Sequence, residues 1–525
     1  MYPKNKMKIV LIILVSLFLI VAVPPMITAA ATATSTPTPQ PTPVSTSTSI
    51  THTIRLKADG KGDYPDLPAA VEAAKPGDTI ALEKGIYKLK ESLEIQKAIT
   101  LVGDGIDKTT ITSQAGGFVV KFSGQGPFNS QGITFKHEGS KSASVVIVES
   151  GEVAFQDCHF TGAVSYKYQY YQSAGLVLRG NVTGMVQNST ADKNGYGFFI
   201  TDQAQPILKN NVCSNNESVG IAIFKQAQPT LEENTCAGNR EYGIYFEEST
   251  GGIARKNQVS KNKWAGIFIG DQAQPTLEEN IISENQEYGI YYQNKAGGVA
   301  RKNQVMKNLW IGIQIDNQAQ PTLEENTVSE NGFAGIRIHT QGNNNVVIRK
   351  NQITKSYIGI IVEMRSQATV EENTCSENRS SGIYFGGAAT GKVIKNQLTK
   401  NSKGIEVAGQ AQPTLEDNIC SENQEAGIAF IHMSSGKALK NQCTKNKGSG
   451  ILVTDEAQPI LEENTSSENT KYGIEYNSFA GGTAQKNTCS GNKIGIYIAQ
   501  TANPELEDNI CQDNTEMDIK DFRKK

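Results

Sequence analysis

The chain has 525 residues, with 50 Lys and Arg against 53 Asp and Glu. This near-neutral balance argues against a general nucleic-acid-binding protein, which normally carries a basic excess or a basic patch. Glycine is frequent, at 49 residues, and asparagine recurs throughout, so the chain is more repetitive and turn-rich than an ordinary globular domain.

Residues 1–31 have the layout of a secretory signal. Basic residues precede the apolar run IVLIILVSLFLIVAV at 9–23, and small residues follow it. The run is shorter than the about 20 apolar residues that a full membrane span needs. Pro24, Pro25 and the next residues would extend it into an uncleaved anchor. Both interpretations place the body outside the cytoplasm, either secreted or tethered to the cell envelope.

Residues 32–51 form a Ser/Thr/Pro-rich linker, which cannot bury a core and stays extended. Residues 52–112 predict a short helix, roughly 66–75, followed by strands TIALEKGIYKL and AITLVGDG. We expect the helix to cap the first coil of a repetitive fold, because an open strand edge is prone to aggregation.

Residues 113–195 contain irregular coils and a Tyr-rich insertion, SYKYQYYQS, at 165–173. Regular repeats then cover 196–516. Residues 517–525 form a charged tail, and its KDFRKK sequence is expected to protect the other end of the fold.

The regular repeats align on a glycine that returns every 22 to 24 residues, most often every 23. The first and third residues after this glycine are apolar, as in Ile267 and Ile269, whereas Phe268 between them occupies a variable position. This alternation predicts a strand with one buried face. A single coil cannot bury that face alone, but stacked coils enclose a continuous core.

The pattern therefore predicts an all-β fold, a single-stranded right-handed parallel β-helix with about 23 residues per coil. A leucine-rich repeat is the rival solenoid, but its Leu-x-x-Leu-x-Leu framework is missing.

Two asparagine columns accompany the glycine. Asn257 and Asn262, for example, lie nine and four residues before Gly266. Stacked asparagines can form a ladder of hydrogen-bonded amides from coil to coil. Asparagine also tolerates left-handed turn geometry, which explains the columns without a ladder. Neither explanation requires a ligand.

The residue before the first asparagine alternates in charge from coil to coil. The column reads Glu233, Lys256, Glu279, Lys302, Glu325, Lys350, Glu372, Lys395, Asp417, Lys440, Glu463, Lys486 and Asp508. Identical coils would place like charges opposite one another, which destabilises a sheet. Alternation converts that repulsion into attraction. We expect these charge ladders to define a double repeat and to disfavour slippage by one coil.

Seven of the eight cysteines occupy one column that other coils fill with aliphatic residues. They are Cys213, Cys236, Cys375, Cys420, Cys443, Cys489 and Cys511. The column is therefore interior, and buried thiols are favoured over disulfides because parallel Cβ vectors do not suit a disulfide. The five histidines are scattered, and no Cys-x-x-Cys pair occurs, so no metal site or cofactor is predicted.

The N-terminal sequence DGKGDYPDLPAAVEAAKPGDTI, with GIYKL and ITLVGDG after it, resembles the start of pectin-lyase-like β-helix proteins, pectin methylesterases among them. The alternating PTLEEN…GI and GGVARKN…GI coils resemble carbohydrate-binding and sugar-hydrolase (CASH, PbH1) repeats. Such repeats occur in NosD-type periplasmic proteins and in the β-helix of F-box-only proteins. The resemblance covers about 52–515 and implies a β-helix fold.

The sequence departs from these families in its chemistry. Catalytic motifs of pectin methylesterases, alginate epimerases and polygalacturonases are missing, and FQDCHF at 155–160 reads as an ordinary coil turn. No F-box segment is present, so ubiquitin ligase activity is not implied. The histidines give no support to the copper role of NosD proteins.

Aromatic residues form a stripe over coils 196–335. The candidate carbohydrate-binding residues are Tyr245, Trp264, Phe268, Tyr291, Trp310, Asp271 and Asp316. Aromatic faces stack on sugar rings, and the acids can accept hydrogen bonds from sugar hydroxyls. The alternative is that the rings pack on each other and simply cover the sheet.

The sequence favours a secreted or membrane-tethered protein of the cell envelope that acts as a non-catalytic carbohydrate-binding, adhesive or structural module. Its expected partner is an extracellular polysaccharide or cell-surface glycan. No catalytic residue is assigned, because the ladders pair acids with bases and so suppress the raised pKa that a general acid needs. One alternative is a polysaccharide lyase, epimerase or hydrolase acting on an acidic polysaccharide through the face at 165–340. A second is a protein-interaction scaffold.

Overall fold

The structure is a computed structural model that describes residues 51–165 and 173–523. The predicted signal or anchor at 1–31, nearly all of the linker and most of the Tyr-rich insertion lie outside the described residues. Within these two ranges, no helix is long and apolar enough to span a bilayer.

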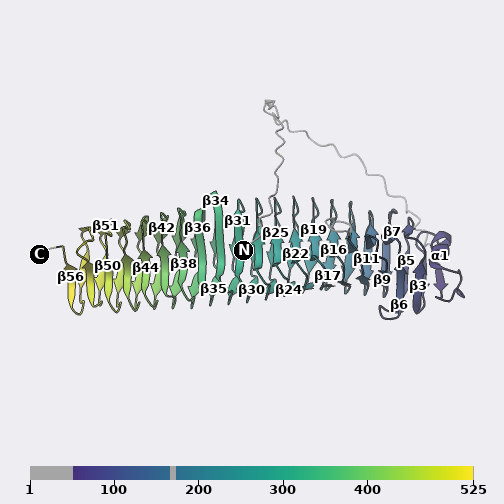
Figure 1. The fold of residues 1–525 in the computed structure, drawn as a ribbon, viewed down its shortest axis with the longest axis horizontal. Helices are drawn as coiled ribbons and strands as arrows, with labels where there is room; N and C mark the ends of the chain where they lie inside the picture. The colour runs from purple at the N-terminus through teal and green to yellow at the C-terminus, as the bar shows by residue number, and fades with distance from the viewer. Residues whose placement is uncertain (1–50, 166–172, 524–525) are drawn as a thin grey trace, which may run out of the picture. The chain divides into compact units, whose positions relative to one another are not determined.

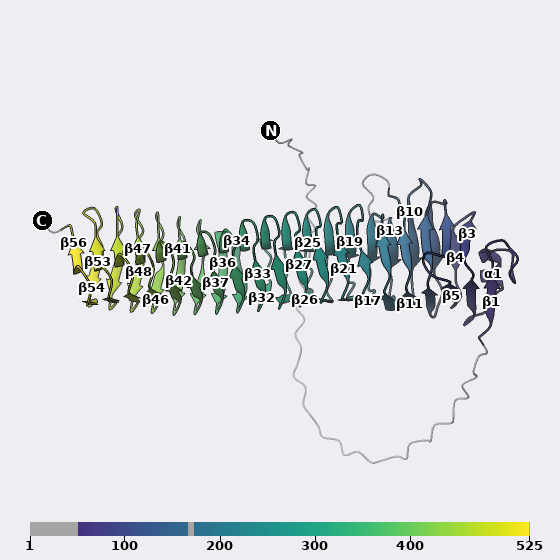
Figure 2. The same cartoon turned by 90° about the horizontal axis from the view of Figure 1, so that it is seen from below.

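The described residues form a parallel β-solenoid of about 20 turns with about 23 residues per coil. A typical coil contains β25 (Ala265–Ile269), β26 (Thr276–Glu278) and β27 (Ile281–Ser283), which can be followed in Figure 2. Each of the three strands pairs in parallel, and in register, with the equivalent strand of the next coil. The coils follow one another in chain order from the helix α1 (Leu67–Ala73) to β56 (Met517–Asp521) (Figure 1).

The strands before the regular coils are β1 (Thr53–Leu56), β2 (Thr79–Leu82), β3 (Gly85–Leu89), β4 (Leu93–Ile95), β5 (Thr100–Gly103), β6 (Thr109–Ser113), β7 (Gly117–Phe122), β8 (Phe128–Gln131) and β9 (Thr134–His137). The first strands of the later coils are β10 (Ala143–Val148), β13 (Ala174–Leu178), β16 (Tyr196–Ile200), β19 (Val219–Ile223), β22 (Tyr242–Phe246), β25, β28 (Tyr288–Tyr292), β31 (Ile311–Asn317), β34 (Ala334–Arg349), β36 (Ile358–Glu371), β38 (Ser381–Phe385), β41 (Lys403–Val407), β44 (Ala426–Phe430), β47 (Ser449–Val453), β50 (Tyr472–Tyr476), β53 (Ile494–Ile498) and β56. In β34 and β36 the strand continues through the first turn and also serves as the second strand.

The second strands are β11 (Glu152–Gln156), β14 (Thr183–Gln187), β17 (Ile207–Lys209), β20 (Thr230–Glu232), β23 (Ile253–Arg255), β26, β29 (Val299–Arg301), β32 (Thr322–Glu324), β39 (Thr390–Ile394), β42 (Gln412–Glu416), β45 (Lys437–Leu439), β48 (Ile460–Glu462), β51 (Thr483–Gln485) and β54 (Glu505–Glu507). The third strands are β12 (His159–Thr161), β15 (Thr190–Asp192), β18 (Val212–Cys213), β21 (Thr235–Ala237), β24 (Gln258–Ser260), β27, β30 (Gln304–Met306), β33 (Thr327–Ser329), β35 (Gln352–Thr354), β37 (Thr374–Ser376), β40 (Gln397–Thr399), β43 (Ile419–Ser421), β46 (Gln442–Thr444), β49 (Thr465–Ser467), β52 (Thr488–Ser490) and β55 (Ile510–Gln512).

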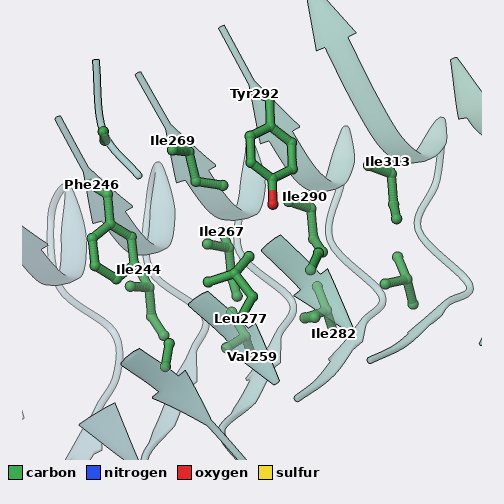
Figure 3. Packing of buried hydrophobic residues seen from close by; sticks show 14 of the residues in the cluster. Ile244, Phe246, Val259, Ile267, Ile269, Leu277, Ile282, Ile290, Tyr292 and Ile313 are labelled. Atoms are coloured by element: carbon green, nitrogen blue, oxygen red, sulfur yellow. The ribbon is translucent and has the colours of Figure 1, made fainter. Parts of the chain in front are cut away.

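The core runs along the inside of the coils. Ile267 and Ile269 of β25 meet Leu277 of β26 and Ile282 of β27 there, and all four side chains are fully buried (Figure 3). Burying one such side chain stabilises a fold by about 1.5–3 kcal/mol. The alternation predicted from the sequence is therefore the arrangement that fills the interior, coil after coil.

The asparagine ladders are confirmed. Asn257 Nδ2 donates to Asn280 Oδ1, and Asn280 Nδ2 donates to Asn303 Oδ1, each over 2.9 Å. The backbone N–H of Asn257 also donates to Asn280 Oδ1, at 3.0 Å, so one oxygen accepts two hydrogen bonds. The second ladder repeats this pattern, with Asn285 Nδ2 donating to Asn308 Oδ1 at 2.9 Å.

Left-handed geometry does not explain these two asparagine columns. The left-handed residue is the charged residue immediately before the asparagine, with φ of 53° at Glu279 and 54° at Lys302. A side chain other than glycine is strained in that region, and the strain is sustained where surrounding structure imposes it. The ladder bonds at each following asparagine supply that constraint.

The alternating charges pair between coils as predicted. Arg301 Nε lies 3.0 Å from Glu278 of the preceding coil, and Lys302 Nζ lies 4.0 Å from Glu325 of the following coil. Lys350 Nζ likewise lies 4.0 Å from Glu372 of the following coil. Because these side chains are partly exposed, each pair is worth at most about 1 kcal/mol.

All eight cysteines are free thiols, as favoured from the sequence. Cys420 faces Cys443, and Cys489 faces Cys511, in register on adjacent coils. Only Cys511 is partly exposed. Burial raises the pKa of the Cys236 thiol, which keeps it protonated and inert.

The predicted N-terminal cap is confirmed. Asp66 accepts a hydrogen bond from the backbone N–H of Ala69 at 2.9 Å and so caps α1. Leu67, Ala70 and Val71 of the helix are buried in the core that begins at β1.

The other end differs from the prediction. Residues 517–521 of the expected charged tail form the last strand, β56, which pairs with β53, and Met517, Ile519 and Phe522 of this tail are 43–49% exposed. Its acids and bases pair locally instead, with Arg523 lying 3.0 Å from Asp521.

Candidate functional site

The outward side chains of the first strands form one long surface, which we call the outer face. Along it, Tyr245, Phe268, Tyr291, Gln314 and Arg337 lie opposite one another on five consecutive coils. The parallel register places their side chains in a single column, about 4.8 Å apart along the solenoid.

The rings of the outer face pack against each other. Tyr245 stacks on Phe268 with ring centroids 4.8 Å apart, and Phe268 meets Tyr291 edge to face at 5.4 Å. Phe268 and Tyr291 are only 4% and 7% exposed, whereas Trp264 and Trp310 are 42% and 37% exposed. The two tryptophans therefore present ring surface to solvent, and the buried rings support them.

Rings that reach solvent follow one edge of the outer face, and we call them the edge row: Trp264, Trp310 and Tyr357, which are exposed, and Phe333, which is partly buried. Trp264 stacks on Tyr242 at 5.0 Å, and Phe333 stacks on Tyr357 at 6.1 Å. Tyr357 is 46% exposed. Tyr357 was not among the predicted site residues. Its position, two residues before Gly359, is the one that Trp264, Trp310 and Phe333 hold before their own glycines.

Beyond the rings, the outer face becomes polar around Asp316. Tyr291 Oη donates to Asp316 Oδ2 at 2.9 Å, Gln314 Nε2 donates to Oδ1, and His339 Nδ1 lies 3.6 Å from Oδ1. Arg337 Nε donates to Glu363 Oε1 at 2.7 Å. We call Gln314, Asp316, Arg337, His339 and Glu363 the polar cluster. The scattered histidines of the sequence gave no sign that His339 lies beside an acid.

Glu247 is the acid of this surface with a raised pKa. Burial raises the pKa, the charges of Asp271 and Glu248 add to the effect, and a hydrogen bond from Tyr245 Oη opposes it. Glu247 lies outside the charge ladders, so the pairing of acids with bases expected for the ladders does not extend to it.

A groove follows the turns between first and second strands. It is a chain of hollows of about 760, 380, 470 and 840 Å³, and neighbouring hollows share lining residues. Glu248 and Ser249 join the first to the second, Asn294 and Lys295 join the second to the third, and Gln341 joins the third to the fourth. We call this continuous depression the first-turn groove.

The structure divides the predicted site residues between two surfaces. Tyr245, Trp264, Phe268, Tyr291, Trp310 and Asp316 lie on the outer face, whereas Asp271 lines the first-turn groove. There Asp271 Oδ1 accepts a hydrogen bond from Asn294 Nδ2 at 2.9 Å. In the described ranges, no group of three or more His, Cys, Asp and Glu side chains could hold a metal ion.

The chain belongs to the right-handed β-helix family. A family model described as "Right handed beta helix region" matches residues 143–300, 292–439 and 432–519, well over half of the chain. This match confirms the predicted fold and handedness and supports the resemblance to pectin-lyase-like proteins. No curated protein sequence matches the chain significantly.

Several solved structures are similar in fold. A Dettilon tailspike protein (gp208) is 12% identical, with a TM-score of 0.40, over 64% of this chain and 66% of its own. An alginate lyase from Paenibacillus sp. str. FPU-7 is 14% identical, with a TM-score of 0.40, over 52% and 98%. A carrot pectin methylesterase is 16% identical, with a TM-score of 0.31, over 45% and 84%. At these values the likeness concerns the fold alone.

Proposed function

We propose that the protein is a non-catalytic polysaccharide-binding module, exported from the cytoplasm and either secreted or held at the cell envelope. The observation that carries the proposal is the edge row, in which exposed rings recur along a rigid sheet. Aromatic faces stack on sugar rings, and solenoid surfaces suit extended polymers. The basic, apolar and small segments at 1–31 support export.

The rings of the edge row are held in place before any ligand binds. Trp310 packs on Tyr288 at 5.3 Å, and Tyr288 in turn contacts Tyr291, which is 7% exposed. A preordered ring loses little conformational entropy on binding, which favours affinity. The coil-to-coil hydrogen bonds beneath keep Trp310, Phe333 and Tyr357 on successive coils. On the coil between Trp264 and Trp310, Glu287 takes the place of the ring.

Depletion of the full chain from solution by insoluble polysaccharides tests the proposal. We expect Trp264→Ala combined with Trp310→Ala to weaken depletion about tenfold, since each ring stacks on one sugar with about 0.5–1.5 kcal/mol. Phe479→Ala is the matched control, because Phe479 is 67% exposed but lies far along the chain from the edge row. Equal binding by both variants, or no binding by the wild type to any polysaccharide, would contradict the proposal.

A second candidate function is a lyase, epimerase or hydrolase acting on an acidic polysaccharide. The polar cluster favours it, because Asp316 and His339 lie 3.6 Å apart beside Arg337, a residue type suited to a uronate carboxylate. Incubation with alginate or pectate should then release unsaturated or reducing sugar ends, and Asp316→Asn should abolish the release. An epimerase breaks no glycosidic bond, so the uronate configuration at C5 is followed as well, by NMR. A wild-type protein that releases neither kind of end and leaves the C5 configuration unchanged would exclude this candidate.

A further inference from the structure

The first-turn groove carries amides that the rest of the fold does not use. Its lining includes six glutamines at equivalent turns: Gln203, Gln226, Gln272, Gln318, Gln341 and Gln410. All six are exposed. Among the described residues, their side-chain amides have no hydrogen-bond partner, whereas each interior asparagine amide is occupied by its ladder. Each groove amide is therefore free to donate and accept hydrogen bonds to a ligand.

The turns repeat the same backbone geometry at each coil. Each of these coils contributes two consecutive residues to the groove. The first of the two is left-handed on five successive coils, with φ of 48° to 63°: Asp202, Lys225, Glu248, Asp271 and Asn294. The side chain after each left-handed residue therefore returns at an equivalent place on each coil. Glutamine holds that place at Gln203, Gln226 and Gln272, whereas Ser249 and Lys295 hold it on the other two coils, so all five coils present a polar side chain.

The spacing suits a carbohydrate polymer. Successive coils are about 4.8 Å apart, close to the advance per residue of an extended hexopyranose chain. A polymer lying along the groove would present one sugar to each coil. The coils that carry glutamine would then offer its hydroxyls the same kind of amide, and Ser249 and Lys295 offer other polar groups on the coils between them.

The groove carries both acids and bases, which favours a neutral polymer. Asp202 and Lys225 form an ion pair at 2.6 Å, Glu248 and Asp271 follow, and Lys295 comes next. A polyanion would meet the acids in turn, and a polycation would meet the lysines. Hydroxyl groups are complementary to both charges and to the amides between them.

We propose that the first-turn groove binds a neutral, hydroxyl-rich polysaccharide along the solenoid axis, an inference that rests on the proposed function. The groove is then the surface that selects the polymer by hydrogen bonding. The edge row lies at the start of the first strands, whereas the groove lies at their end. It contributes ring stacking, which does not distinguish neutral from acidic sugars.

The test compares depletion of the full chain by cellulose and insoluble β-1,3-glucan with depletion by calcium alginate beads. We expect the neutral polymers to bind more tightly. Gln226→Ala combined with Gln272→Ala should weaken that binding about tenfold, since each lost hydrogen bond is worth about 0.5–1.5 kcal/mol. Gln286→Ala with Gln424→Ala is the matched control, because both residues are exposed outside the groove lining.

A second variant, Ser249→Trp, fills the point where the first two hollows meet and should abolish binding to the neutral polymers. Circular dichroism spectra matching the wild type show that these surface variants are folded. Loss of binding in the groove variants, with normal binding in the control pair, supports the inference.

Three outcomes overturn the inference. Preference for alginate contradicts the neutral ligand. Binding that is lost with Trp264→Ala and Trp310→Ala but unaffected by the groove variants leaves the proposed function standing and removes the groove from it. Absence of binding to every polymer overturns the groove and the proposed function together.

Discussion

Coils 196–385 and coils 403–498 share a backbone plan but differ on their outer faces. Interior positions are alike, since Ile267 and Ile269 in one region correspond to Ile451 and Val453 in the other, all fully buried. Outside, the first region has stacked rings and two exposed tryptophans. The second has Glu406, Ala429, Leu452 and Glu475 at the positions of Tyr245 and Phe268, and a ring, Tyr497, returns at its last coil.

The difference separates what builds the coil from what the coil presents. Ladders, interior apolar residues and alternating charges recur in both regions because every coil must bond to its neighbours. Outward side chains bear no such constraint, so their variation carries the information about ligands. Substitutions at interior positions should therefore act equally in both regions, and outward substitutions should not.

The largest effect is expected from breaking an interior ladder. Asn280→Ala removes an oxygen that accepts two hydrogen bonds from Asn257 and an amide that donates to Ala254 O at 2.8 Å. Leaving such buried groups unpaired costs about 1–3 kcal/mol each. We expect a loss of about 3 kcal/mol or more in the free energy of unfolding, measured by urea titration followed by circular dichroism.

Asn441→Ala is the counterpart in the second region, because Asn441 Oδ1 accepts two hydrogen bonds from Asn418 and its amide donates to Leu415 O. Its cost should match that of Asn280→Ala within about 1 kcal/mol. A large difference between the two would show that the regions are not equivalent inside. Gln286→Ala, at an exposed position, should change stability little.

A smaller effect is expected from the thiol column. Cys236→Ser buries a hydroxyl and should cost about 1 kcal/mol, at the low end of the range for a buried polar group. The low value follows from Ser466, which occupies the same column and donates to Gly473 O at 2.6 Å. Cys236→Val should be near neutral, since Val259 fills this position on the next coil.

Cys443→Ser should behave like Cys236→Ser, since both thiols are fully buried. Thermal unfolding of the wild type with and without a reducing agent tests for disulfides in this column. We expect the same melting temperature under both conditions. A melting temperature that falls on reduction would mean that disulfides form in this column.

Charge reversal should have a still smaller effect. Lys302→Glu replaces the contact with Glu325 by repulsion and should cost up to about 1 kcal/mol in low salt. Lys440→Glu, opposite Glu463 at 3.7 Å, is the equivalent change in the second region. The fall in melting temperature should shrink in high salt, because salt screens exposed charges. An unchanged melting temperature in low salt would refute the role of the charge ladders.

The smallest effect is a pH dependence confined to the first region. Burial raises the pKa of Glu247 in the folded protein, so the ionised carboxylate destabilises the fold. This destabilisation is absent at low pH, where Glu247 is protonated, and develops as the pH rises through the folded pKa. Glu247→Gln should therefore stabilise the fold near neutral pH and not at acidic pH. Glu422→Gln, at an exposed position, is the control. A stability gain that is equal at all pH values would contradict the raised pKa.

The fold was predictable to a large extent because its determinants are local and repeated. The glycine step, the alternation at Ile267 and Ile269, the ladders and the N-terminal helix all follow from residues that act through their own coil and its neighbours. The function of the asparagine columns was left open by the sequence, and the hydrogen bonds of Asn257 and Asn280 decide it.

The candidate site was predictable only in part. The sequence identified the ring stripe, but it did not reveal that Phe268 and Tyr291 are buried while Trp264 and Trp310 stay exposed. Tyr357 was not predicted, although it lies two residues before Gly359, the position that the tryptophans hold before their own glycines. Asp271 was assigned to the rings, whereas it lines the groove on the other edge.

The sequence by itself determined that this protein is a stack of similar parallel coils, because the repeat length, the alternation and the alternating charges concern neighbours one coil apart. Only the tertiary structure decided which outward side chains are covered and which reach solvent. It also decided how the turns join into a groove and that Asp316 meets His339 at 3.6 Å. The reason is physical: stacking follows from a period that can be counted along the chain, whereas exposure and hollows depend on side-chain sizes and directions across several coils at once.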